Sequence, residues 1–192
     1  MITDWRKHMI DKSADQCLEG TAFILSLLDT LKPKVYVETG CAHLATFELY
    51  HSLLPEDGLA IGIDLRAYEP WKTYEQIAST NKYSAFSLYS NGLQNLETTR
   101  RTMTDLLNRS IDFLFIDGDH SEKGVQLDWN ILGPKVRSGG LVVLHDYDPS
   151  AFKRGVRDGQ GAAILCDSLA KQGYDIKSIK NTKIGTAYFY KP

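Results

Sequence analysis

Ionisable side chains gather at two points in the second half of the chain, each directly after an apolar run. The first group follows Phe113–Ile116 and the second follows Leu141–Leu144. Together the two groups contain Asp117, Asp119, His120, His145 and Asp146. In an open α/β sheet, the carboxyl ends of the parallel strands form the edge where ligands bind. We therefore expect these side chains to converge on one crevice, as the side chains of an enzyme site do.

Carboxylates and imidazoles in one crevice could hold a divalent cation or move a proton. Adjacent parallel strands lie about 5 Å apart, so Asp117 and Asp146 could each bind one ion at ~2.0–2.6 Å. With His145 they form the predicted metal site. Asp119, His120 or His145 could take a proton from a substrate. A simpler alternative is that solvent pairs with the acids and that His120 only caps the following helix.

Two strand ends in the first half of the chain carry residues suited to a nucleoside. Gly40 follows Val35–Glu38 in a turn where a ligand could approach the backbone. Asp64 ends Leu59–Asp64, where a carboxylate can accept both hydroxyls of a ribose. Asn91, after a third strand, could contact a base. The alternatives are an ordinary strand-to-helix turn, a helix cap and a surface charge.

Strand-like and helix-like segments alternate along the chain. Strands are expected at Val35–Glu38, Leu59–Asp64, Ala85–Tyr89, Phe113–Ile116, Leu141–Leu144, Tyr174–Ile179 and Thr186–Tyr190. Helices are expected between Ala14 and Leu31 and over Thr46–Leu54, Trp71–Ser79, Leu93–Asn108, Gly124–Leu132 and Val156–Lys171, with Gly173 capping the last. This alternation predicts a mainly parallel sheet with helices on both faces. The short link between the last two strands predicts a hairpin, and so an antiparallel last strand.

Length and composition favour one domain over residues 1–192. A chain of 192 residues can bury a full core, and a net charge of −2 points to no nucleic-acid partner. The longest apolar run, Ala22–Leu28, is too short to span a bilayer. The cysteines Cys17, Cys41 and Cys166 are widely spaced, which favours a reducing, cytoplasmic location. The N-terminus has no apolar region typical of a signal peptide.

Residues 1–32 precede the first predicted strand and stand outside the core alternation. Trp5–Leu31 contains an amphipathic helix with more apolar surface than a free tail should carry. We expect this segment either to pack over or beside the ligand cleft as a lid, or to form the contact of a homo-oligomer.

The sequence resembles class I S-adenosylmethionine-dependent methyltransferases, in particular the branch with macrocin-type sugar O-methyltransferases and cephalosporin-hydroxylase-like proteins. The resemblance runs from Val35 to the C-terminus and is most specific over Asp112–Tyr147. The recurring string of that branch matches Asp117-Gly118-Asp119-His120-Ser121, then Gly139-Gly140, then His145-Asp146-Tyr147. The resemblance implies a Rossmann-like sheet of seven mainly parallel strands whose last strand is antiparallel.

The same resemblance implies where the cofactor binds. S-adenosylmethionine is expected over Glu38, Gly40 and Asp64, with Asn91 near the adenine and Asp117 at the border between cofactor and metal. A full GxGxxG is absent, because the glycine-rich loop is reduced to Gly40.

The resemblance also implies a metal. In metal-dependent members, the position of Asp117 and the pair that matches His145-Asp146 hold magnesium, and the position of Asp119 is assigned as a base. Strict magnesium sites often carry a second acid where this chain has His145. Because imidazole suits manganese better than magnesium, either ion is a candidate.

The leading hypothesis is a methyltransferase that acts on the hydroxyl of a small-molecule acceptor: a sugar, a polyketide or a phenol. A metal would lower the pKa of that hydroxyl. One alternative is a catalytically silent cofactor-binding protein of the same fold, which the glycine-poor loop favours. Another is an NAD-dependent oxidoreductase, with Asp64 on the ribose, although the lack of GxGxxG argues against it.

Overall fold

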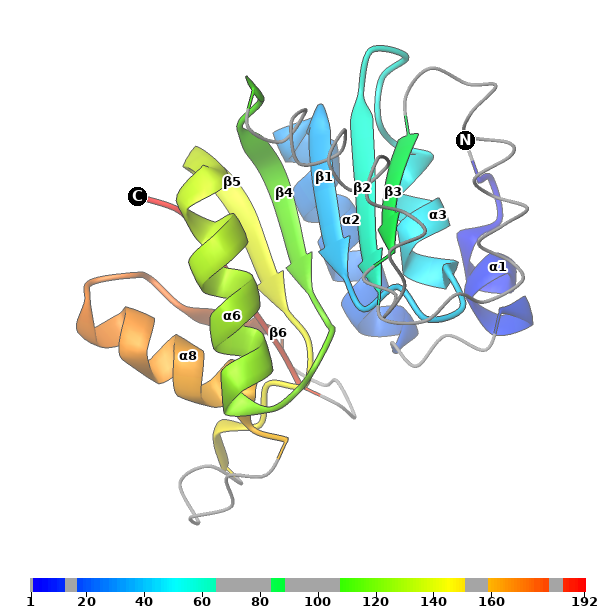
Figure 1. Ribbon diagram of the computed structural model, residues 1–192. Coiled ribbons are helices and arrows are strands. Elements are labelled where there is room, and N and C mark those ends of the chain that lie inside the picture. The colour runs from blue at the N-terminus through cyan, green and yellow to red at the C-terminus, as the bar shows by residue number, and fades with distance from the viewer. Residues whose placement is uncertain (1, 13–16, 65–83, 89–107, 151–158, 180–184) are drawn as a thin grey trace.

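The protein is built on one seven-stranded sheet in the order β3-β2-β1-β4-β5-β7-β6 (Figure 1). A computed structural model describes residues 2–12, 17–64, 84–88, 108–150, 159–179 and 185–192. The strands are β1 (Val35–Thr39), β2 (Leu59–Asp64), β3 (Ser84–Leu88), β4 (Ile111–Ile116), β5 (Val136–Leu144), β6 (Lys177–Ile179) and β7 (Thr186–Tyr190). Strands β1 to β5 pair in parallel. The last strand, β7, is antiparallel to both β5 and β6, as predicted.

Five α-helices lie within the described residues. They are α1 (Trp5–Asp11), α2 (Leu18–Leu31), α3 (Ala45–His51), α6 (Glu122–Leu132) and α8 (Gly161–Lys171), with a short 3-10 turn at Gly133–Lys135. The predicted helices over 71–79 and most of 93–108 lie outside the described residues, as does the predicted first turn of the last helix. The alternation of strand and helix in the remainder agrees with the prediction.

Helices cover both faces of the sheet because the central strands are apolar on both sides. Successive side chains of a strand point to opposite faces, so Tyr36 and Phe113 pack against α1, α2 and α3. Val37 and Leu114 pack on the other face, against α6 and α8. The ribbon shows these two layers, with α6 and α8 on one side of the sheet and α2 and α3 on the other (Figure 1).

Two helix ends stop where the sequence predicts. Helix α2 ends at Leu31, and its C-cap Lys32 takes a left-handed φ of 50° before Pro33. At the end of α8, the Gly173 N–H donates to Ala170 O and the Tyr174 N–H to Leu169 O. This pair of hydrogen bonds is the Schellman motif that a glycine after a helix favours.

The N-terminal segment packs against the core. Met9 of α1 is buried beside the residues of α2 and α3. His8 Nε2 lies 3.0 Å from the Ala45 carbonyl oxygen, and Lys12 Nζ lies 2.8 Å from a Glu48 carboxylate oxygen. Helix α1 therefore sits on α3, beside the first strand end, and its predicted role as a lid or oligomer contact stays a prediction. None of the described helices has the length and apolar character needed to cross a membrane.

Candidate active site

Four strand ends bring the predicted site residues into one row. The register pairs Thr39 with Ile63 and with Ile116, and Ile116 with Leu144. The residues that close or follow these positions are Gly40, Asp64, Asp117 and His145. The backbone ladder continues into the row, since the Asp117 N–H donates to Thr39 O and the His145 N–H to Ile116 O. The sheet itself therefore positions these residues.

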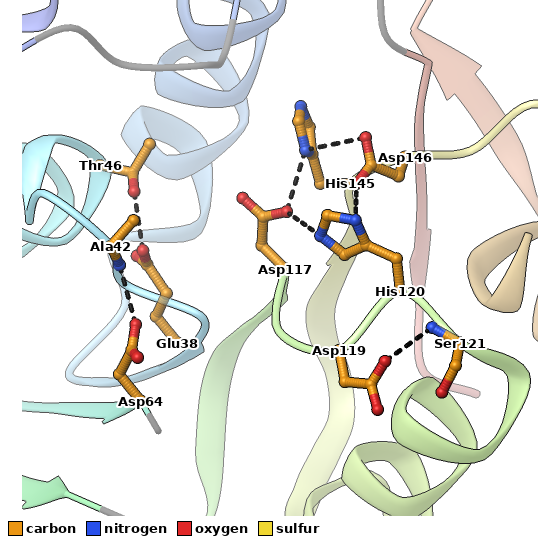
Figure 2. A network of polar contacts seen from close by, with 10 residues as sticks. All are labelled: Glu38, Ala42, Thr46, Asp64, Asp117, Asp119, His120, Ser121, His145 and Asp146. Carbon is orange, nitrogen blue, oxygen red and sulfur yellow. Dashed lines mark hydrogen bonds and ion pairs between the residues drawn. The ribbon is translucent and has the colours of Figure 1, made fainter. Parts of the chain in front are cut away.

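Two aspartates and two histidines form a compact cluster at the ends of β4 and β5 (Figure 2). His145 Nδ1 lies 2.9 Å from Asp117 Oδ1, and His120 Nδ1 lies 2.6 Å from Asp146 Oδ2. His120 Nε2 is also 3.6 Å from Asp117 Oδ1. We refer to these four residues as the acid–histidine cluster. The predicted convergence of the two strand ends is present.

The backbone at Asp146 is unusual. Its φ is 55°, in the left-handed region that few residues other than glycine adopt, although Asp and Asn tolerate it better than most. The next residue is held in place, because the Tyr147 N–H donates to Gly185 O. A strained residue beside ionisable groups is typical of a functional site.

Within the cluster, the charges of the two histidines and the two aspartates stabilise one another. Hydrogen bonds to Asp117 and then Asp146 raise the pKa of His120 to about 10. Burial lowers the pKa of His145, but the hydrogen bond to Asp117 and the negative charges of Asp117 and Asp146 together outweigh it, so the pKa is raised. Burial likewise opposes the hydrogen bond from His120 at Asp146, whose pKa is lowered overall. At neutral pH, His120 therefore holds a proton, and it must lose that proton before it can act as the predicted base.

Three residues of the cluster are placed to bind one cation. Asp117, His120 and Asp146 each offer a ligand atom, and these atoms lie within 4.8 Å of one another. The predicted metal set contained His145 in place of His120. The structure instead places the His145 ring in the interior, 6% exposed and 6.5 Å from the Phe115 ring centroid. His145 Nδ1 nevertheless lies 2.9 Å from Asp117 Oδ1 and 3.5 Å from Asp146 Oδ1, so both histidines of the cluster lie beside the two acids, and the predicted metal set stays a prediction. A set of one nitrogen and two carboxylates suits manganese.

Asp119 lies apart from the cluster. Its Oδ1 accepts a hydrogen bond from the Ser121 N–H at 2.9 Å, and its side chain points toward the start of α6 (Figure 2). The backbone hydrogen bond from Ser121 is the main cause of its lowered pKa. In this structure Asp119 stabilises the turn before α6, and its predicted role as a base stays a prediction.

The turn after β1 requires a glycine. Gly40 has a φ of 77°, and a Cβ at this position would lie 1.9 Å from the carbonyl oxygen of Asp117. The Ala42 N–H donates to Asp64 Oδ2 at 2.9 Å, which ties this turn to the end of β2. The two predicted halves of a nucleoside site are therefore in contact with each other. Asn91, predicted near a base, lies outside the described residues.

Glu38 is buried below this turn. Thr46 Oγ1 donates to one oxygen of its carboxyl group at 2.7 Å, and the Tyr36 hydroxyl donates to the other. Burial, together with the negative charges of Asp117 and Asp64, raises the pKa of Glu38 well above its usual range. Glu38 is fully enclosed, so its support for the turn is visible, whereas its predicted contact with a cofactor stays a prediction.

A cavity of about 610 Å³ opens beside the acid–histidine cluster. His120 and Asp146 form one wall, and the other residues come from the segment after β5, the start of α8, β6 and β7. Gln160, Ser178 and Thr186 are polar members of this lining. These three residues were not predicted from the sequence, because they lie far apart in the chain and carry no motif.

The fold is shared with solved methyltransferases. An O-methyltransferase from Bacillus cereus, solved in complex with S-adenosylhomocysteine, superposes with a TM-score of 0.69 at 13% identity, over 97% of this chain and 90% of that chain. The O-methyltransferase TomG from Streptomyces achromogenes, involved in tomaymycin synthesis and solved with S-adenosylmethionine, gives 0.65 at 14% identity, over 99% and 89%. The methyltransferase PaMTH1 of Podospora anserina, bound to S-adenosylhomocysteine, gives 0.63 at 12% identity, over 100% and 89%.

Sequence comparison identifies the family. An uncharacterized protein of Acanthamoeba polyphaga mimivirus, R132, is 46% identical over 43 residues, which is 22% of this chain and only 20% of that protein. A family model described as a methyltransferase domain matches residues 20–147, a stretch that contains Gly40, Asp64 and the whole acid–histidine cluster. Taken with the shared fold, this match shows that the chain belongs to the methyltransferase-domain family.

Proposed function

We propose that the protein is an S-adenosylmethionine-dependent O-methyltransferase that acts on the hydroxyl of a small molecule. One observation carries the proposal: the Gly40 turn lies directly against Asp117, and Asp117 belongs to the cluster that borders the 610 Å³ cavity. A cofactor over the turn and an acceptor in the cavity would then meet at the cluster. A cavity of this size accommodates a small ligand.

The turn supports the cofactor half of the proposal. Gly40 lets the turn after β1 close tightly against the Asp117 backbone, and the carboxylate of Asp64 stands one strand away, where a ribose would bind. When bound, S-adenosylmethionine supplies a methyl carbon attached to a positively charged sulfur. The carboxylates of Asp64 and Asp117 would favour that charge. The cofactor-bound relatives of the same fold agree with this interpretation.

The cluster supports the acceptor half. The acceptor oxygen must lie about 3 Å from the methyl carbon and opposite the leaving sulfur. Bound S-adenosylmethionine would supply the methyl group and its sulfur would keep the electron pair of the broken C–S bond, while the proton of the acceptor hydroxyl would pass to a base of the protein. His120 and Asp146 border the cavity and belong to the acid–histidine cluster, so they are candidates to take this proton. His120 accepts it only after losing the proton that its acid partners now stabilise.

A bound cation would remove the need for His120 to lose its proton to the solvent first, because a metal ligand is already deprotonated. Asp117, His120 and Asp146 would hold a divalent ion, with manganese better suited than magnesium. The ion would supply Lewis acidity that lowers the pKa of a bound hydroxyl. The same residues also permit a metal-free version, in which a histidine takes the acceptor proton and Asp117 or Asp146 orients its ring. Activity in EDTA separates the two versions.

Calorimetry with S-adenosylmethionine tests the proposal first. We expect binding by the wild-type protein, followed by transfer of a radiolabelled methyl group to a hydroxylated acceptor. No binding would overturn the proposal. Binding without transfer to any member of a broad acceptor panel would favour the catalytically silent cofactor-binding protein.

A further inference from the structure

Gln160 combines three features that set it apart from the other residues of the cavity. It is the N-cap residue of α8, yet its side chain makes no capping hydrogen bond. It lines the same cavity as His120 and Asp146. Its amide oxygen Oε1 is buried and has no hydrogen-bond partner among the described residues. A buried unpaired acceptor destabilises a protein by about 1–3 kcal/mol, so a function that retains it is expected.

The backbone holds Gln160 close to the cluster. The Gly161 N–H donates to the His120 carbonyl oxygen at 2.9 Å, which fixes the first turn of α8 against the loop that carries His120. This approach depends on glycine, because a Cβ at Gly161 would lie 2.4 Å from the carbonyl oxygen of Ser121. The backbone therefore holds Gln160 and His120 next to each other in the lining of the cavity.

The lining offers hydrogen-bond acceptors from several parts of the fold. Asp146 and Asp148 contribute carboxylates, and Ser178 and Thr186 contribute hydroxyl groups that can accept as well as donate. The terminal amide of a glutamine turns about a soft torsion, so a donor group placed in the cavity can draw the Gln160 oxygen toward it. A ligand with several hydroxyl groups fits this lining better than one with a single hydroxyl group.

We infer that Gln160 is a specificity residue of the acceptor cavity, and that its amide oxygen accepts a hydrogen bond from a second hydroxyl group of a polyhydroxylated methyl acceptor. The inference rests on the proposed function in one respect: that the bound molecule is the methyl acceptor. The binding of a polyhydroxylated molecule by Gln160 does not depend on it. It adds a residue outside the acid–histidine cluster that selects the ligand rather than reacting with it.

Ligand-observed NMR tests the inference with two pairs of probes: methyl α-D-glucopyranoside against cyclohexanol, and catechol against phenol. The wild-type protein should bind at least one polyhydroxylated probe about 10-fold or more tighter than its single-hydroxyl partner, and Gln160→Met should reduce that preference to about 2-fold. The pair that shows the preference tells a sugar-like from a phenolic acceptor. Gln172→Met, at the exposed opposite end of α8, is the matched control and should keep the wild-type preference.

Thermal unfolding adds a readout that needs no ligand. Because the Gln160 oxygen has no hydrogen-bond partner in the described part of the chain, Gln160→Met should melt at or above the wild-type temperature. A fall of more than about 4 °C would mark Gln160 as structural and overturn the inference. So would a wild-type protein without a preference for either polyhydroxylated probe, or a Gln160→Met variant that keeps the preference. All probes are measured with and without S-adenosylhomocysteine, so a failure of cofactor binding is seen separately.

Discussion

At the ends of β1 and β2, the polar groups are bonded to the turn that they support, whereas at the ends of β4 and β5 ionisable side chains are bonded to one another. Asp64 accepts from the Ala42 backbone and Glu38 from Thr46. In the acid–histidine cluster, by contrast, His120 joins Asp117 to Asp146. The first region depends on backbone geometry and the second on charge, so different changes should break each.

The largest effect is expected from a methyl group at Gly40. Gly40→Ala places a Cβ 1.9 Å from the Asp117 carbonyl oxygen at a φ of 77°. The turn must move, and we expect either loss of folding or a loss of cofactor affinity of about 100-fold or more, which corresponds to roughly 3 kcal/mol. Thermal unfolding and calorimetry measure the two outcomes.

Gly173→Ala is the matched control for that change. Gly173 also has a positive φ, of 95°, but a Cβ there meets nothing within 4 Å. Only the backbone strain remains, about 1–2 kcal/mol, and cofactor affinity should not change. Equal effects of the two substitutions would show that space at Gly40 is unimportant.

The next effect concerns the charge of the second region. If a cation is used, EDTA should abolish methyl transfer and manganese should restore it. Asp117→Asn should prevent that rescue. The rate of methyl transfer should then fall by about 100-fold or more, as for other residues that contact the reacting groups. Asp175→Asn, an exposed aspartate paired with Lys177, is the control. Full activity in EDTA would contradict the metal-assisted version and favour the metal-free one.

A smaller effect is expected at Asp64. Asp64→Ala removes the acceptor of the Ala42 N–H and the proposed partner of the ribose. Affinity for S-adenosylmethionine should fall by about 1–3 kcal/mol, the usual loss for hydrogen bonds to a charged group. Asp29→Ala, an exposed change on α2, should leave the affinity as it is. An unchanged affinity in a folded Asp64→Ala protein would remove Asp64 from the cofactor site.

The smallest effect is a dependence of stability on pH. The pKa of His120 is raised to about 10 in the folded protein, against about 6.5 when unfolded. Its ion pairs therefore stabilise the fold fully below pH ~6.5, and this contribution is lost as the pH rises toward about 10. Because the ring is half exposed, the difference should stay below about 1 kcal/mol.

Urea unfolding in EDTA, for the wild-type protein and for His120→Gln, measures this term at pH 6, 8 and 10. The difference in unfolding free energy between the two proteins should shrink as the pH rises. A difference that grows with pH would mean that His120 is not paired as a cation in the folded state.

The strands and the acidic strand ends could be predicted from the sequence, because apolar runs buried on both faces leave a strong pattern. The run Leu59–Asp64 was predicted with the observed bounds. Strand β5 begins at Val136, earlier than predicted. The prediction missed its first part because Arg137, Ser138 and two glycines interrupt the apolar pattern there. Such a polar extension has no pattern that distinguishes it from a loop.

The details of the site were harder to predict. The approach of His120 to both Asp117 and Asp146 depends on the path of the loop after β4 and on the left-handed φ of Asp146. Sequence spacing does not report either. Gln160 and Thr186 reach the cavity only through the packing of α8 and the pairing of β7 with β5. Contacts of this kind depend on the whole fold.

The backbone of Asp146 has a consequence for how this site can evolve. A left-handed residue next to the cluster tolerates Asp, Asn and Gly far better than other residues. One substitution can therefore change the charge of the side chain at position 146 from −1 to 0 while the turn keeps its shape. If the acid–histidine cluster binds a cation as proposed, descendants of this chain could therefore change or lose that binding without passing through an unfolded intermediate sequence.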